Sequence, residues 1–112
     1  MMNNVMTING FQAVITFDPD ILMFRGEFVG LNGGADFYAK DIDGLRREGE
    51  ISLKVFVEMC ERDGVPVKKP RGKFALRLDQ DTYHHASVAA AASGKSLNQF
   101  IAEAVRSAVS HA

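Results

Sequence analysis

Residues 72–105 of this 112-residue chain read GKFALRLDQDTYHHASVAAAASGKSLNQFIAEAV and contain three successive patterns. The first pattern, over residues 73–78, alternates side chains of different polarity, so that Phe74, Leu76 and Leu78 share one face of an extended chain. This alternation predicts a short amphipathic strand. Its other face carries Lys73, Ala75 and Arg77.

Two helices are predicted after this strand. The first covers about residues 80–92, with Asp79 or Asp81 as its N-cap and Gly94 beyond its end. Ser96 and Gln99 form a capping-box pattern at the start of the second helix. The apolar residues of that helix recur at intervals of three and four, as one buried face requires: Leu97, Phe100, Ile101, Ala104, Val105, Ala108 and Val109.

The predicted strand has no partner strand within these roughly 40 residues, and a core of this size is too small to stand alone. We therefore predict that two copies pair their strands as an antiparallel ribbon and interlock their helices. The predicted dimer core consists of Phe74, Leu76, Leu78, Leu97, Ile101 and Val105. The outward faces of the two strands then form a narrow basic surface, a shape that the major groove of DNA admits.

This segment closely resembles the Arc-like ribbon-helix-helix DNA-binding domain, especially the version at the C-terminus of HicB-like antitoxins. Residues 94–101 match the turn between the two helices and the start of the second. The resemblance implies base contacts from Lys73, Ala75 and Arg77, and further DNA contacts, to phosphate, at the second helix start from Lys95, Ser96, Leu97 and Asn98. Ala75 departs from the family, in which this position is usually polar, so base discrimination is expected mainly from Arg77 and Lys73.

Upstream, the sequence predicts a three-stranded antiparallel meander. Residues 11–17 alternate in the period of a strand with one buried face, and a second apolar run covers residues 21–31. Asn32 and Gly33 suit a type I′ hairpin turn, because that turn needs positive φ at both central residues. The third strand is expected over about residues 34–39.

A helical period begins at Ile42, with Asp41 or Asp43 available as N-cap and Gly64 as the C-terminal cap. Gly49 lies inside this helix and is costly there relative to alanine. Either the helix approaches the sheet closely at Gly49, or the helix breaks in two, and of these we expect the close approach.

The N-terminal half also resembles HicB, more loosely. The FDPD turn at 17–20, the strand segment FVGL at 28–31 and the helix end CERDG at 60–64 carry this resemblance. It implies a degenerate, catalytically inert RNase H-like scaffold. The expected α+β chain then has a HicB-like toxin-binding domain at 1–65, a basic linker at 66–72 and a ribbon-helix-helix domain at 73–112.

Charge divides the chain in the same way. Residues 1–64 carry six Lys or Arg and eleven Asp or Glu, a net charge of −5, whereas residues 65–112 carry seven against three, a net charge of +4. This asymmetry suggests a basic partner for the first half and a polyanion for the second. Between them, the sequence VPVKKPRGK at 65–73 cannot continue a helix, and it is either a linker or a solvated surface loop.

Catalysis, metal binding and cofactor binding are not expected. The carboxylates Asp18 and Asp20 bracket a proline turn, so with Glu27 and Asp36 they do not suggest a two-metal site. Cys60 is the single cysteine, and His84, His85 and His111 have no zinc-ligand spacing with it. The apolar runs are too short to span a membrane and no signal peptide is recognisable, so the expected location is the cytoplasm.

Two functions are consistent with these patterns. The first is a type II antitoxin that neutralises a HicA-like RNA-cleaving toxin and represses its own operon as a homodimer or a higher oligomer bound to operator DNA. The alternative is a ribbon-helix-helix transcriptional regulator whose N-terminal module binds a ligand or another protein, with no toxin. The toxin-facing surface is left open between the sheet face, a strand edge and the helix.

Overall fold

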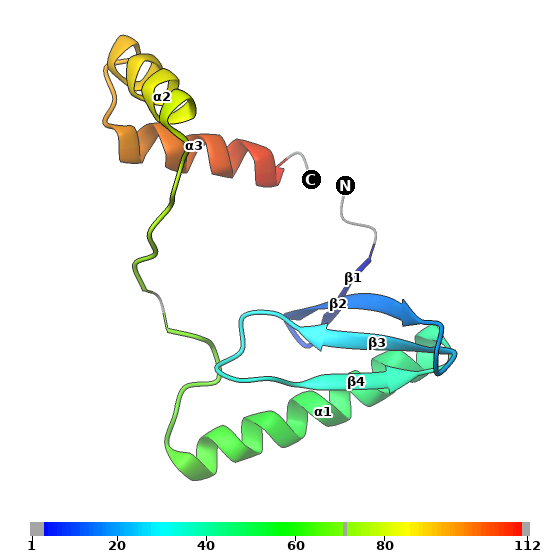
Figure 1. The fold of residues 1–112 in the computed structure, drawn as a ribbon. Coiled ribbons are helices and arrows are strands. Elements are labelled where there is room, and N and C mark those ends of the chain that lie inside the picture. The colour runs from blue at the N-terminus through cyan, green and yellow to red at the C-terminus, as the bar shows by residue number, and fades with distance from the viewer. Residues whose placement is uncertain (1–3, 71, 111–112) are drawn as a thin grey trace. The chain divides into compact units, whose positions relative to one another are not determined.

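The computed structural model describes residues 4–70 and 72–110. The chain is α+β and divides into two compact units, Met2–Gly72 and Lys73–Ala112 (Figure 1). No helix in the described residues is both long and apolar enough to cross a membrane. Arg71 of the expected linker and His111 lie outside the described residues.

The first unit contains a four-stranded antiparallel sheet in the order β1-β2-β3-β4. Its strands are β1 (Val5–Ile8), β2 (Phe11–Asp18), β3 (Met23–Phe28) and β4 (Asp36–Ala39). The prediction of three strands is therefore wrong by one, because β1 was not anticipated. Its period-2 signal is short, since only Met6 and Ile8 alternate into the core.

The two Asn-Gly pairs behave differently. Asn9 and Gly10 have φ of 49° and 84° and join β1 to β2, as a two-residue hairpin requires. Asn32 does not have positive φ, so the type I′ turn predicted at Asn32-Gly33 is wrong. Instead, the backbone N–H of Asn32 donates to Val67 O at 2.8 Å and its side chain donates to Pro66 O at 3.2 Å. These bonds hold the connection from β3 to β4 in a wider loop.

Helix α1 (Ile42–Asp63) covers one face of the sheet (Figure 1). The Asp41 side chain caps it by accepting the Gly44 N–H at 2.6 Å, and Gly64 ends it with φ of 68°, so both predicted ends are confirmed. The helix and the inner sheet face bury one apolar core, made of Met6, Ile8, Ala13, Phe28, Leu31, Ala35, Phe37, Ala39, Leu45, Leu53, Phe56 and Cys60.

Gly49 lies where α1 comes closest to the sheet. A Cβ atom at this position would lie 2.3 Å from Cδ1 of Ile8 and 3.1 Å from the Phe37 ring. The helix continues through Gly49 without interruption. The close approach is therefore confirmed, and a break in the helix is excluded.

The second unit contains α2 (Gln80–Ala92) and α3 (Leu97–Ser110), which start and end close to the predicted positions. Asp79 caps α2 by accepting the Thr82 N–H at 3.1 Å, and Gly94 has φ of 68° in the turn that follows. The strand expected over residues 73–78 is absent, because the described part of the chain provides no strand to pair with it. The RNase H-like and ribbon-helix-helix assignments stay predictions.

Candidate functional site

An apolar groove of about 550 Å³ opens on the second unit. The extended segment before α2 and the first half of α3 supply most of its walls, and all six residues of the predicted dimer core line it: Phe74, Leu76, Leu78, Leu97, Ile101 and Val105. Tyr83 of α2 also lines the groove and was not included in the predicted dimer core. Its place as a large aromatic residue in the first turn of the helix, soon after Leu78, was the available signal.

Several large apolar side chains that line the groove are exposed to solvent. Phe74 is 83% exposed and Leu76 is 52% exposed, and α3 has no buried residue. Among the described residues of the second unit, Ala90 is the one buried hydrophobic side chain. Since covering one Phe or Leu side chain contributes about 1.5–3 kcal/mol, a partner that fills this groove would stabilise the unit considerably.

The predicted base-reading residues lie on the segment that borders this groove. Lys73, Ala75 and Arg77 are exposed, and in an extended chain they point away from Phe74, Leu76 and Leu78. The structure therefore separates a basic side of residues 73–78 from an apolar side. In the described residues of the single chain, the segment with Lys73, Ala75 and Arg77 is not paired with a second strand.

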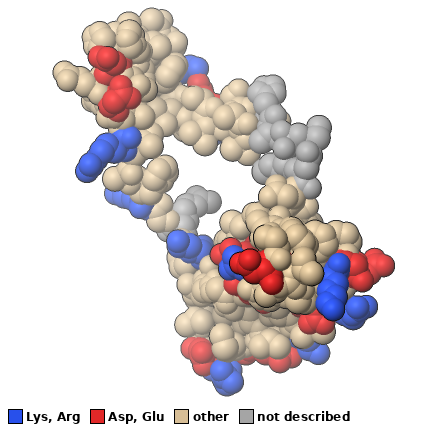
Figure 2. Space-filling view, turned by 45° about the vertical axis from the view of Figure 1, so that its right-hand side comes forward, with Lys and Arg blue, Asp and Glu red and all other residues tan. Residues whose placement is uncertain are grey.

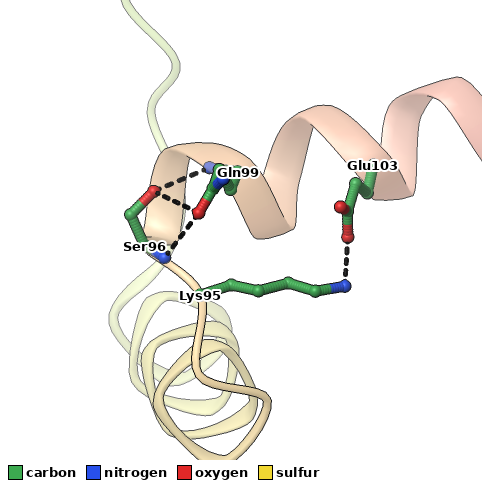
Figure 3. A network of polar contacts seen from close by, with 4 residues as sticks. All are labelled: Lys95, Ser96, Gln99 and Glu103. Carbon is green, nitrogen blue, oxygen red and sulfur yellow. Dashed lines mark hydrogen bonds and ion pairs between the residues drawn. The ribbon is translucent and has the colours of Figure 1, made fainter.

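The N-terminus of α3 has a complete capping box (Figure 3). The Gln99 N–H donates to Ser96 Oγ at 3.1 Å, and the Ser96 N–H donates to Gln99 Oε1 at 3.3 Å. The capping box predicted at these two residues is thus confirmed. The N–H groups of Leu97 and Asn98, in the first turn, have no acceptor within the helix, as at any helix N-terminus. Both side chains line the apolar groove, and their phosphate contact stays a prediction.

The resemblance implies that Lys95 contacts DNA, but in this structure Lys95 forms an ion pair within its own unit. Its Nζ pairs with the Glu103 carboxylate two turns along α3, as Figure 3 shows. Both side chains are partly exposed, and exposed pairs of this kind contribute about 0–1 kcal/mol. A phosphate contact by Lys95 therefore requires it to leave Glu103, at little cost.

The carboxylates of the first unit serve structural contacts. Arg25 donates to Asp36 at 2.5 Å and lies 3.4 Å from Glu27 on the outer face of the sheet. The hydrogen bond to Asp36 and the negative charge of Asp36 raise the pKa of Arg25. Asp18 accepts the Asp20 N–H at 3.0 Å in the turn after β2. Acidic and basic side chains are mixed over this unit, with broad uncharged areas between them (Figure 2).

The beginning of the predicted linker is attached to the first unit. Leu31 and Lys68 form an antiparallel bridge, and the Lys69 N–H donates to Gly30 O at 2.9 Å. The Lys68 ammonium also lies 5.7 Å from the centre of the Phe11 ring, within the range of a cation–π contact. Both lysines therefore have places on the surface of the first unit.

The comparisons with known proteins bear on the second half of the chain. The model of the HicB family matches residues 56–105, from the second half of α1 through α2 into α3. Searches among curated proteins and among solved structures each gave no match. Residues 56–105, a little under half of the chain, are thus similar to the HicB family.

Proposed function

We propose that this chain is the antitoxin of a type II toxin-antitoxin system. In this proposal the first unit neutralises a HicA-like RNA-cleaving toxin, and the second unit forms a dimer that represses the operon by binding operator DNA. The observation that carries the proposal is the overlap of two findings. The segment that matches the HicB family includes residues 73–78, α2 and the part of α3 up to Val105, and these supply all the residues that line the groove.

A second copy of the chain suits the groove for two physical reasons. Its Phe74, Leu76 and Leu78 would cover the apolar walls, and its backbone would supply hydrogen-bond partners for residues 73–78, which form no strand in the single chain. Both needs are met by one antiparallel pairing. The proposed dimer is therefore held together by the same residues that are exposed in one copy.

In the proposed dimer, the face of the two-stranded ribbon that points away from the groove contacts DNA. Pairing would place Lys73, Ala75 and Arg77 of both copies on one face. Residues 73–112 carry four Lys or Arg and three Asp or Glu, a net charge of +1, and two of the four basic residues lie on this face. A bidentate arginine–guanine contact is worth about 1–3 kcal/mol of discrimination, and a phosphate contact affects all sequences equally. Arg77 is thus expected to set base preference, with the N-terminus of α3 positioning the protein on phosphate.

Arg77→Ala tests this assignment, with Arg106→Ala of α3 as the matched control. Each variant removes one arginine per copy, and both arginines are exposed. Binding to a randomised operator library at two salt concentrations should show that Arg77→Ala loses preference at a defined position in each half-site. Arg106→Ala should keep that preference. An Arg77→Ala protein with full sequence preference would show that the ribbon does not read bases.

Toxin neutralisation is tested by growth rescue. Residues 1–70 have a net charge of −3 and are expected to rescue cells that express a HicA-like toxin, without binding DNA. The full chain should do both. Rescue by residues 66–112 alone would contradict the assignment. Failure of the full chain to rescue, with operator binding retained, would favour the regulator that has no toxin partner.

A further inference from the structure

Helix α1 carries exposed apolar side chains in addition to those that it packs against the sheet. Ile51 is 52% exposed, Val55 57% and Met59 42%, and the three follow one another at four-residue steps. Residues four apart in a helix lie one above the other on the same side. The same step adds an exposed basic residue at one end and an exposed acidic residue at the other. We call the complete set the α1 row: Arg47, Ile51, Val55, Met59 and Asp63.

The folding of the first unit does not explain the α1 row. Ile51 and Val55 are β-branched, and such residues are weaker helix formers than alanine or leucine. Asp63 is the last residue of α1, where the helix dipole disfavours a negative charge, and its exposed ion pair with Arg62 at 3.5 Å contributes little. Arg47 forms no ion pair within the described part of the chain. These residues therefore contribute little to a single copy.

A shallow hollow of about 250 Å³ adjoins the α1 row. Val55 and Met59 line it together with Ala35, just before β4. The Ser52 hydroxyl donates to the carbonyl oxygen of Asp36 at 3.3 Å and joins α1 to β4 at this place. A partner of the row thus meets a hollow in which an apolar side chain can be buried.

The charges beside the α1 row favour neither sign. On one flank, residues 50, 54, 58 and 62 alternate in charge at four-residue steps, and Glu48 lies on the other flank. With the two ends of the row included, three basic residues stand against four acidic ones, a net charge of −1. Such a surface attracts neither a polyanion nor a strongly basic protein. It suits a partner that is apolar and carries both signs, and a second copy of the row has this composition.

The two ends of the α1 row are complementary to each other. If the second copy lies antiparallel, with Val55 near the two-fold axis, Arg47 faces Asp63 of that copy and Ile51 faces its Met59. Each contact occurs twice, because a two-fold interface is isologous. A parallel pair would place Arg47 against Arg47 and Asp63 against Asp63, which repel each other. Packing between rows of this four-residue step is also the commonest helix pairing in globular proteins.

We propose that the α1 row is a second self-association surface, which packs antiparallel against the α1 row of another copy of this chain. Its apolar area is too small for a stable interface on its own. The inference therefore rests on the proposed function, in which the dimer of the second units keeps the copies at a high effective concentration. A chain that lacks this dimer is expected to stay monomeric.

Cross-linking of the full chain under a mild oxidant measures the contact. Val55→Cys places a thiol near the two-fold axis, where facing Cα atoms of two packed helices come within the reach of a disulfide, about 4.4–6.8 Å. Glu61→Cys is the matched control, because Glu61 is exposed on α1 and points away from the neighbouring row member Met59. Cys60 is 3% exposed, so the unmodified chain gives the background.

Reversal of the end charges tests the antiparallel direction. In the Val55→Cys chain, Arg47→Asp places two carboxylates opposite each other at both ends of the pair and should slow cross-linking at least about threefold. Adding Asp63→Arg exchanges the two charges and should restore the rate. The two positions are sixteen residues apart in one helix, about 24 Å, so they cannot touch within one copy. Rescue therefore reports a contact between copies.

We expect Val55→Cys to cross-link at least about tenfold faster than Glu61→Cys. Equal rates, or a charge-exchanged chain as slow as Arg47→Asp, would overturn the inference. If the unmodified chain sediments as a monomer, the proposed dimer fails and this inference fails with it. If it sediments as a dimer and Val55→Cys does not cross-link, the α1 contact is wrong while the function stands. If, in addition, Val55→Glu no longer neutralises the toxin, the toxin is the occupant of the row and the inference is overturned.

Discussion

Gly26→Ala is predicted to destabilise the first unit, because the Phe37 ring occupies the space of the added Cβ. Gly26 and Phe37 are register partners on β3 and β4. A Cβ on Gly26 would lie 2.2 Å from Cζ of Phe37, far inside the roughly 3.5–4.0 Å of an ordinary carbon contact. On its other side the ring faces Gly49, where a Cβ would lie at 3.1 Å, so the ring has little room to retreat.

The size of the effect follows from two opposing contributions. Overpacking a dense core costs about 1–3 kcal/mol. Replacing glycine by alanine within a strand contributes about 0.5–1 kcal/mol in the opposite direction, because alanine loses less conformational freedom on folding. We therefore expect a net loss of about 1 kcal/mol, and at most about 2.5 kcal/mol, in the free energy of unfolding of this unit.

Amide hydrogen exchange on β3 and β4 of the full chain measures this free energy without interference from the second unit. Gly34→Ala is the matched control, since no atom lies within 4 Å of its added Cβ and it should be neutral or slightly stabilising. Adding Phe37→Leu to Gly26→Ala should recover part of the loss, which gives a favourable coupling energy. Equal stability of the Gly26→Ala and Gly34→Ala proteins, or strict additivity in the double variant, would refute the reasoning.

Three further predictions concern the helix caps and the groove. Asp41→Ala removes the acceptor of the Gly44 N–H and should lower stability by about 1 kcal/mol in urea denaturation, whereas Asp41→Asn should change it little. Hydrogen bonds from the side chain of Thr82, and to a smaller extent from its backbone N–H, lower the pKa of Asp79. The stabilisation of α2 by Asp79 is therefore present above the pKa that Asp79 has in the unfolded state, and it is lost as the pH falls through the pKa in the folded state. The amide resonance of Thr82 should shift with this acid transition, and Asp79→Asn should abolish the shift. Leu76→Glu places a charge in the groove and should convert the proposed dimer to monomer in sedimentation, so a folded dimer of this variant would contradict the assigned interface.

The three helices could be predicted closely from sequence because their signals are local. Asp41 and Gly64 delimit α1, and Ser96 with Gln99 begins α3, through contacts between residues three or four apart. The expectation of a close approach at Gly49 was also correct, since a glycine inside a strongly periodic helix needs such a reason. The residues on the apolar face of 73–78 and on that of α3 could also be listed from sequence, because the backbone sets the period at which side chains return to one face. These residues line the groove.

The turns of the sheet could not be predicted from local sequence alone. Asn9-Gly10 and Asn32-Gly33 carry the same turn residues, yet only the first pair forms a tight hairpin. Asn32 instead bonds to Pro66 and Val67, more than 30 residues later in the chain. The conformational preference of a dipeptide is weak compared with the three hydrogen bonds that join this loop to residues 66–69, two of which form the Leu31–Lys68 bridge.

Sequence alone therefore determined the helices, the acidic and basic halves, and the two-sided character of residues 73–78, because each depends on residue type and on the period of a single element. Tertiary structure decided the fourth strand, the attachment of Lys68 and Lys69 to the first unit, the pairing of Lys95 with Glu103, and the gathering of Phe17, Phe24 and Ile42 around one hollow. These features join residues that are distant in the chain. Their free energy comes from contacts that exist only after the chain has folded, so no local pattern carries them.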